Sequence, residues 1–154
     1  MTGAIAAQEY LQELVRSDPH DVARLVEVPR DCDAFLWQYE HIRQLLIELN
    51  GLIALLAGKC TPKTCPVLRV QNESYRCTTH GELRDCSAYE YMLHNADNAT
   101  EFVLGRRQLL KPVEGRESDA LPDLHQIFKR VYRMLAHTLL YHSDVFAEFE
   151  ARTA

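Results

Sequence analysis

The sequence lacks any long hydrophobic run, and no apolar stretch approaches the roughly 20 residues that cross a bilayer. It therefore does not predict an integral membrane protein. The first residues, MTGAIAA, lack the basic region and apolar core of a secretory signal, so we expect a cytoplasmic location. Basic residues are not in excess either: 17 Lys and Arg stand against 22 Asp and Glu, a net charge of −5. That balance argues against nucleic acid as a partner, because phosphate-backbone binding needs a positive surface.

Glycine and proline are scarce, at six each in 154 residues, and no repeat, low-complexity tract or flexible linker divides the chain. A chain of this length buries about 70% of its unfolded surface, which is enough for a real core. A hydrophobic content of 47% argues against a disordered chain. We therefore expect residues 1–154 to form a single domain.

The spacing of apolar residues predicts a mainly α-helical fold. Five helical segments are expected: 4–15, 21–26, 33–57, 87–103 and one that begins near Pro122. In segment 33–57 the apolar residues recur alternately four and three apart, so they share one helix face and make this the core helix. Two short strands, 67–70 and 74–78, are expected around a turn at 71–73. In the last helix six residues should face inward: Leu124, Ile127, Phe128, Val131, Leu135 and Leu139.

Two pairs of residues have the spacing of zinc ligands. Cys60 and Cys65 form a C-x4-C pair in a proline-bounded loop, and His137 and His142 form an H-x4-H pair. Zinc binds two thiolates and two imidazoles in a tetrahedral site, and these spacings lie within the usual range. Cysteines are also common as small buried apolar residues, and histidines often pack or stay solvated, so spacing alone leaves that alternative open.

The histidine spacing also predicts a break in the last helix. Residues five apart on an ideal helix point about 140° away from each other, so His137 and His142 reach one metal only if the helix bends or ends between them. Ser143 and Asp144 follow directly and can begin a new helical turn.

A second group, Cys77, His80 and Cys86, lies beside the predicted strands, but the sequence offers no obvious fourth ligand for it. The long separation of Cys65 from His137 is unlike the ~12 residues of a nucleic-acid-reading zinc finger. It favours a structural metal that ties a loop to the last helix. A zinc hydrolase is the weaker alternative, because the sequence has no H-E-x-x-H and a catalytic zinc needs an open position.

The last predicted helix also carries a cluster of basic residues. Lys129, Arg130 and Arg133 lie with His137 within an arc of about 100°. Three cations on one face could hold a phosphate group through charge-assisted, partly bidentate hydrogen bonds. A solvated polar helix face is the alternative interpretation.

Three stretches together resemble the Mob/phocein family, and within it the phocein branch. They are DAFLWQYEHIRQLLIELNGL at 33–52, the C-x4-C-P motif at 60–66, and FKRVYRMLAHTLLYH at 128–142. The resemblance spans roughly residues 25–150. It implies a Mob-type helical bundle with a short β-hairpin insertion. It further implies a structural Zn²⁺ site at Cys60, Cys65, His137 and His142, and a phosphopeptide pocket at Lys129, Arg130 and Arg133.

The same resemblance implies a non-catalytic adaptor. Phocein-type members belong to a striatin-interacting phosphatase and kinase assembly, so a striatin-type scaffold, phosphatase and kinase subunits, and phosphopeptides are the implied partners. Cytoplasm with peripheral membrane or Golgi contact is the implied location. The alternative within the family is a coactivator of nuclear Dbf2-related kinases. That branch carries a strongly acidic segment before the core helix, whereas residues 29–33 here read PRDCD, which favours the phocein interpretation.

The resemblance also bears on the domain limits. Family members continue through further helices after the position of Ala154, so we expect the C-terminal part of the family fold to be absent and helix 4–15 to be peripheral. Leu135, Phe146 and Phe149 should then be partly uncovered.

Overall fold

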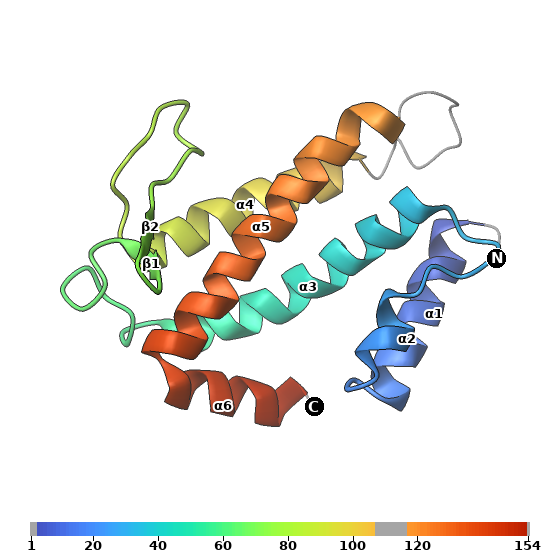
Figure 1. Ribbon diagram of the computed structural model, residues 1–154, viewed down its shortest axis with the longest axis horizontal. Helices are drawn as coiled ribbons and strands as arrows, with labels where there is room; N and C mark the ends of the chain where they lie inside the picture. Colours follow the sequence, from blue (N-terminus) through green and yellow to red (C-terminus); the bar gives the residue numbers. More distant parts are fainter. Residues whose placement is uncertain (1–2, 107–116, 154) are drawn as a thin grey trace.

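The computed structural model describes residues 3–106 and 117–153, which form a helical bundle with a small sheet at one end (Figure 1). The described elements are α1 (Ala4–Ser17), α2 (Val22–Val26), α3 (Ala34–Leu56), β1 (Leu68–Val70), β2 (Glu73–Tyr75), α4 (Ala88–Arg106), α5 (Glu117–Tyr141) and α6 (Ser143–Thr153). The prediction of a mainly helical fold with a short β-hairpin is confirmed. Among the described helices, none is both long and apolar enough to cross a bilayer.

Helix α3 is the centre of the bundle and contacts α1, α4, α5 and α6. It begins where the carboxylate of Asp33 accepts a hydrogen bond from the amide N–H of Leu36, at 2.8 Å, which satisfies one of the first-turn donors. Ile42, Leu52 and Leu56 are fully buried, as the apolar spacing predicted. The core therefore forms around one face of this helix.

Helix α1 lies at one edge of the bundle. It ends at Ser17, before Asp18 and Pro19, because a proline disfavours helical geometry in the residue that precedes it. Leu11 and Leu14 pack against Trp37 of α3 in a small apolar cluster that is separate from the main core. Helix α2 follows and has no buried residue.

The hairpin pairs β1 with β2 in antiparallel register, with Leu68 opposite Tyr75. The turn places Gln71 at φ +53°, and the hydroxyl of Tyr141 donates to the Gln71 carbonyl at 3.2 Å. Leu68 is fully buried. The hairpin is therefore held against the end of α5, as Figure 1 also shows.

Two predictions for α5 are wrong. The helix begins at Glu117, so Pro122 lies inside it and not in its first turn. A proline there removes one backbone hydrogen bond, and the long buried face of α5 offsets that loss. Leu139 is 52% exposed and does not face inward. Near its end α5 packs against β1, so the buried side turns to His137 and Thr138.

The predicted break after α5 is confirmed. Helix α5 ends at Tyr141 and α6 begins at Ser143, with His142 between them. The N–H of His142 donates to the carbonyl of Thr138 at 2.8 Å, and the carbonyl of His142 accepts from the N–H of Phe146 at 3.0 Å. His142 thus closes one helix and opens the next.

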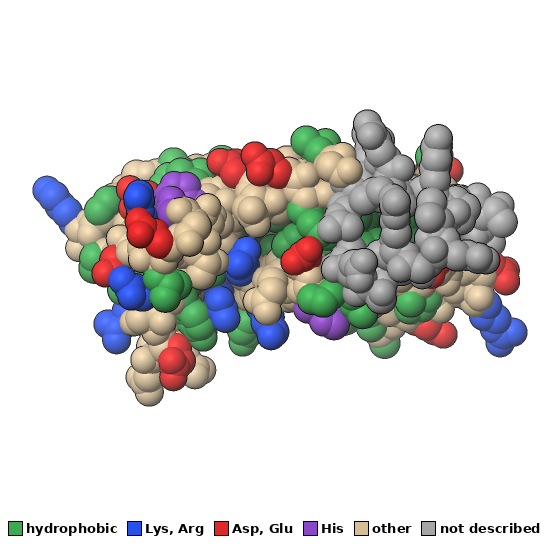
Figure 2. Space-filling view, turned by 90° about the horizontal axis from the view of Figure 1, so that it is seen from above, with side chains coloured by type: hydrophobic (Ala, Val, Ile, Leu, Met, Phe, Trp, Pro, Cys, Tyr) green, Lys and Arg blue, Asp and Glu red, His purple; other side chains and the backbone are tan. Residues whose placement is uncertain are grey.

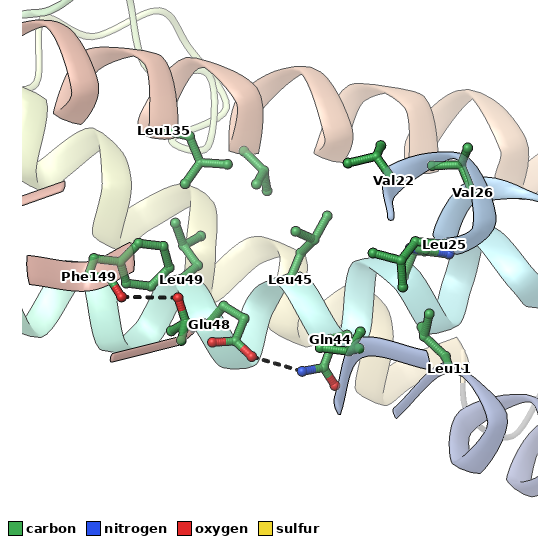
Figure 3. Close-up of a pocket in the computed structure, with 14 residues that line it drawn as sticks. Leu11, Val22, Leu25, Val26, Gln44, Leu45, Glu48, Leu49, Leu135 and Phe149 are labelled. Atoms are coloured by element: carbon green, nitrogen blue, oxygen red, sulfur yellow. Dashed lines mark hydrogen bonds between the residues drawn. The ribbon is translucent and has the colours of Figure 1, made fainter. Parts of the chain in front are cut away.

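An apolar hollow of about 330 Å³ lies where α1, α2, α3, α5 and α6 meet (Figure 3). The side chains of Leu11, Leu25, Leu45 and Leu135 point into it. Leu135, Phe146 and Phe149 are half-buried, as expected from the sequence.

Candidate functional site

The loop after α3 and the end of α5 bring together the four predicted metal ligands. Cys60 and Cys65 lie in that loop, His137 lies in the last part of α5, and His142 lies at the break before α6. Their ligand atoms all lie within 4.8 Å of one another. The Sγ of Cys60 is 3.8 Å from the Nε2 of His137, and the Sγ of Cys65 is 3.5 Å from the Nε2 of His142. We call these four residues the first Cys/His group.

The loop that carries the two cysteines is held by its own backbone. Gly58, at φ +74°, turns the chain out of α3 in a conformation that favours glycine. The N–H of Cys60 donates to the carbonyl of Leu56 at 2.9 Å, and the N–H of Cys65 donates to that of Thr61 at 2.8 Å. These hydrogen bonds hold the backbone at both cysteines, and both side chains are buried.

The imidazole of His137 is oriented by the sheet. Its Nδ1 lies 2.8 Å from the carbonyl of Arg69, and because a carbonyl only accepts, Nδ1 carries the proton. The unprotonated Nε2 then faces Cys60, which is the usual arrangement for a histidine that binds a metal. Burial lowers the pKa of both His137 and His142, so the imidazoles are held in the neutral form that binds metals.

The two cysteines and two histidines of this group are suited to bind a divalent cation. Burial, together with the neighbouring Cys65 thiol, raises the pKa of Cys60 to about 12. A divalent cation would offset this cost by stabilising the thiolates. A tetrahedral ion bound to two sulfurs and two nitrogens places sulfur and nitrogen about 3.6 Å apart, close to the separations found here. Four protein ligands would leave no open position for a substrate.

The basic residues of α5 divide between two surroundings. Lys129 and Arg133 line a hollow of about 420 Å³ together with Tyr75, and the guanidinium of Arg133 lies 4.1 Å from the centre of the Tyr75 ring. Arg130 does not line this hollow. Its guanidinium donates to the hydroxyl of Thr78 at 3.0 Å and to Asn98 at 3.4 Å.

Helix geometry explains that division. Positions 129 and 133 are about 40° apart around a helix, whereas 130 is about 100° from 129. We call Lys129, Arg130 and Arg133 the basic face. Figure 2 shows Lys and Arg side chains gathered over the end of the molecule that carries the sheet, with some Asp and Glu among them.

The structure also brings a fourth candidate ligand, which the sequence did not offer, to the second group. His94 of α4 lies with Cys77, His80 and Cys86, and the ligand atoms of all four are within 4.8 Å of one another. Sequence spacing held one clue: Ser87 and Glu90 predict the start of a helix, which places His94 about two turns into it. A single histidine on a helix gave no reason to assign His94 to this group.

Together these features describe a helical domain with a Cys₂His₂ group at one end and with basic residues on α5, the helix that carries His137 of that group. The model of the Mob1/phocein family matches residues 13–154. The chain is 33% identical over 154 residues to MOB kinase activator-like 4 of Drosophila melanogaster, covering 99% of this chain and 69% of that protein. It is 34% identical to MOB-like protein phocein of Caenorhabditis elegans, with the same coverage. The chain belongs to the Mob1/phocein family.

Proposed function

We propose that this chain is a non-catalytic adaptor of the phocein type that binds phosphorylated partner proteins through its basic face. The main support is that α5 contributes His137 to the first Cys/His group and Arg133 to the hollow that Lys129 also lines. These positions are four apart, one helical turn. An ion that fixes the end of α5 therefore also fixes the cations beside it.

The ion we propose is one structural Zn²⁺ bound by Cys60, Cys65, His137 and His142. Two thiolates with two imidazoles are the donor set that suits zinc and not the hard cations Mg²⁺ and Ca²⁺. A closed set of four ligands speaks against a zinc hydrolase, which keeps a position for water or substrate. The ion would hold the loop after α3 against the break between α5 and α6.

The ligand we propose for the basic face is a phosphate group on a partner peptide. Lys129 and Arg133 open onto one hollow, and Arg133 stacks on Tyr75, which orients its guanidinium. A planar guanidinium held in this way can form two parallel hydrogen bonds to a phosphate. Peptide residues next to the phosphate would contact the exposed ring of Tyr132.

The partners we propose are a striatin-type scaffold and the phosphatase and kinase subunits bound to it. Support comes from the similarity to a relative named phocein and from the mildly acidic PRDCD segment before α3. Cytoplasm with peripheral membrane or Golgi contact is the proposed location. We also propose that residues 1–154 act as one Mob-type domain with α1 at its edge.

A second candidate function is direct activation of a nuclear Dbf2-related kinase. The observation that favours it is the similarity to a relative named a kinase activator-like protein. Both functions are adaptor functions, and they differ in the first protein bound.

Calorimetric titration of the purified chain separates the two. One titration uses a striatin fragment, and the other uses the N-terminal extension of a nuclear Dbf2-related kinase. We expect heat of binding with striatin and none with the kinase extension. The reverse pattern would replace the first candidate by the second, and no binding to either would contradict the adaptor proposal.

A further inference from the structure

The second Cys/His group is formed by the segment that joins β2 to α4 and by α4 itself (Figure 1). Its members are Cys77, His80, Cys86 and His94. Cys77 follows β2, His80 lies in a turn, Cys86 precedes α4 and His94 lies within α4. Four separate parts of the chain thus each place one possible ligand atom in the same small region.

The backbone between the two cysteines is closed into a tight loop. Cys77 and Arg84 exchange two backbone hydrogen bonds, at 2.9 and 3.0 Å. Gly81 lies in the turn at φ +76°, a backbone conformation that residues other than glycine rarely adopt. The loop returns Cys86 to the side of Cys77, and both are buried.

The position of His94 is fixed from the start of α4. The N–H of Ser87 donates to the carboxylate of Glu90 at 2.9 Å, and the N–H of Glu90 donates to the Ser87 hydroxyl at 3.3 Å, so the two residues form a capping box. Asn95 adds a further contact, because its side-chain amide donates to the Tyr91 carbonyl at 2.8 Å and lies 3.8 Å from the Sγ of Cys77. The group thus has a second layer of polar neighbours, as metal sites have.

The separations of the donor atoms lie on both sides of the value for a tetrahedral site. The Nε2 of His80 lies 3.1 Å from the Sγ of Cys86, and the Nδ1 of His94 lies 3.6 Å from Cys86 and 3.9 Å from Cys77. A zinc ion with two sulfur and two nitrogen ligands sets this separation at about 3.6 Å. The first Cys/His group shows 3.5 and 3.8 Å for the same kind of pair.

We propose that Cys77, His80, Cys86 and His94 bind a second structural Zn²⁺ in a closed Cys₂His₂ site. Binding releases the thiol protons to solvent and leaves two thiolates and two neutral imidazoles around the ion. The ion joins the loop of residues 77–86 to the second turn of α4. Thr78, next to Cys77, contacts Arg130, so the site also lies beside the basic face. The site shares no residue with the first Cys/His group.

The test compares the metal content of the full chain with that of a chain carrying Cys77→Ser and Cys86→Ser. Both are purified without chelator, dialysed, and measured by plasma mass spectrometry. We expect the substituted chain to hold one equivalent of zinc less per chain. Cys32→Ser is the control, since Cys32 lies outside both groups and should leave the metal content unchanged. Equal zinc content in the full and the doubly substituted chains would overturn the proposal.

A second measurement keeps the test valid if the substituted chain does not fold. Crystals of the unsubstituted chain are measured with X-rays at the zinc absorption edge. An anomalous peak between the two sulfurs of Cys77 and Cys86 and the rings of His80 and His94 is the expected result. A disulfide between the two cysteines, or four side chains in direct hydrogen-bond contact with no peak between them, would overturn it.

Discussion

Cys60 and His137 stand 77 positions apart in the chain, and the Sγ of one lies 3.8 Å from the Nε2 of the other. Cys65 and His142 show the same separation of 77 positions and a contact of 3.5 Å. The two separations are equal because each pair has the same internal spacing of four intervening residues. The loop after α3 and the end of α5 therefore meet at two cysteine–histidine contacts.

The basic face should bind a phosphopeptide through its arginines. We expect Arg130→Ala with Arg133→Ala to weaken binding of a phosphothreonine peptide by about tenfold or more, since a hydrogen bond to a charged group contributes about 1.5–3 kcal/mol. Fluorescence anisotropy with a labelled peptide measures the change. The matched control is Arg24→Ala with Arg30→Ala, which removes the same charge from exposed positions elsewhere.

Two results would speak against that assignment. Unchanged affinity in the Arg130 and Arg133 variant would remove the basic face from peptide binding. An equal loss in the control variant would show that only net charge matters. Added salt should weaken binding of the unsubstituted chain, because exposed charges are screened.

The core is expected to be most sensitive at α3. Leu52 is fully buried, so Leu52→Ala should lower the free energy of unfolding by about 2–5 kcal/mol through lost burial and a cavity. Ile47 lies on the same helix but is 53% exposed, and Ile47→Ala should change stability by only about 0.5 kcal/mol. Urea unfolding of both variants gives the comparison. Similar losses at the two positions would mean that the buried face of α3 is assigned wrongly.

The capping box at the start of α4 should make a measurable contribution. Ser87→Ala removes the hydroxyl that accepts from Glu90 and should cost about 1 kcal/mol. Ser74→Ala, at an exposed position of β2, is the control and should be close to neutral. Thermal unfolding monitored by circular dichroism is sufficient. A Ser87 variant as stable as the control would leave the box without a role in stability.

Stability should also depend on pH through His41. Burial lowers the pKa of His41 below its ordinary value of 6.5, so the unfolded chain binds a proton that the folded chain does not. The free energy of unfolding is then unaffected by His41 above about pH 6.5, and it falls as the pH drops from there toward the pKa of His41 in the folded chain. His41→Gln should flatten this fall, and His125→Gln, at an exposed position, should not. Urea unfolding between pH 5 and 8 measures the slopes; parallel curves for all three chains would contradict the prediction.

The sequence predicted the features that periodicity and ligand spacing control. Segment 33–57 was predictable because its apolar residues keep one face over six turns, and α3 matches it closely. The break at His142 was predictable because two histidines five apart share a metal only when the helix ends between them. Both features depend on local geometry that the residue order contains.

The errors depend on contacts between distant segments. Leu139 fits the apolar pattern of α5 but is exposed, because the hairpin packs against the end of the helix and turns its buried side toward Thr138. His94 joins Cys77 and Cys86 only because a closed loop returns the chain to α4. The separation of Arg130 from the hollow beside Arg133 depends on the distant partners Thr78 and Asn98. Such pairings have no periodic signal in the sequence.

X-ray absorption at the zinc edge shows directly whether the first Cys/His group binds zinc, when it is measured on the chain carrying Cys77→Ser and Cys86→Ser, so that only this group can contribute. We expect one bound zinc with two sulfur ligands at about 2.3 Å and two nitrogen ligands at about 2.0–2.1 Å. A folded chain without zinc, or an ion with a water ligand and fewer than two sulfurs, would contradict it.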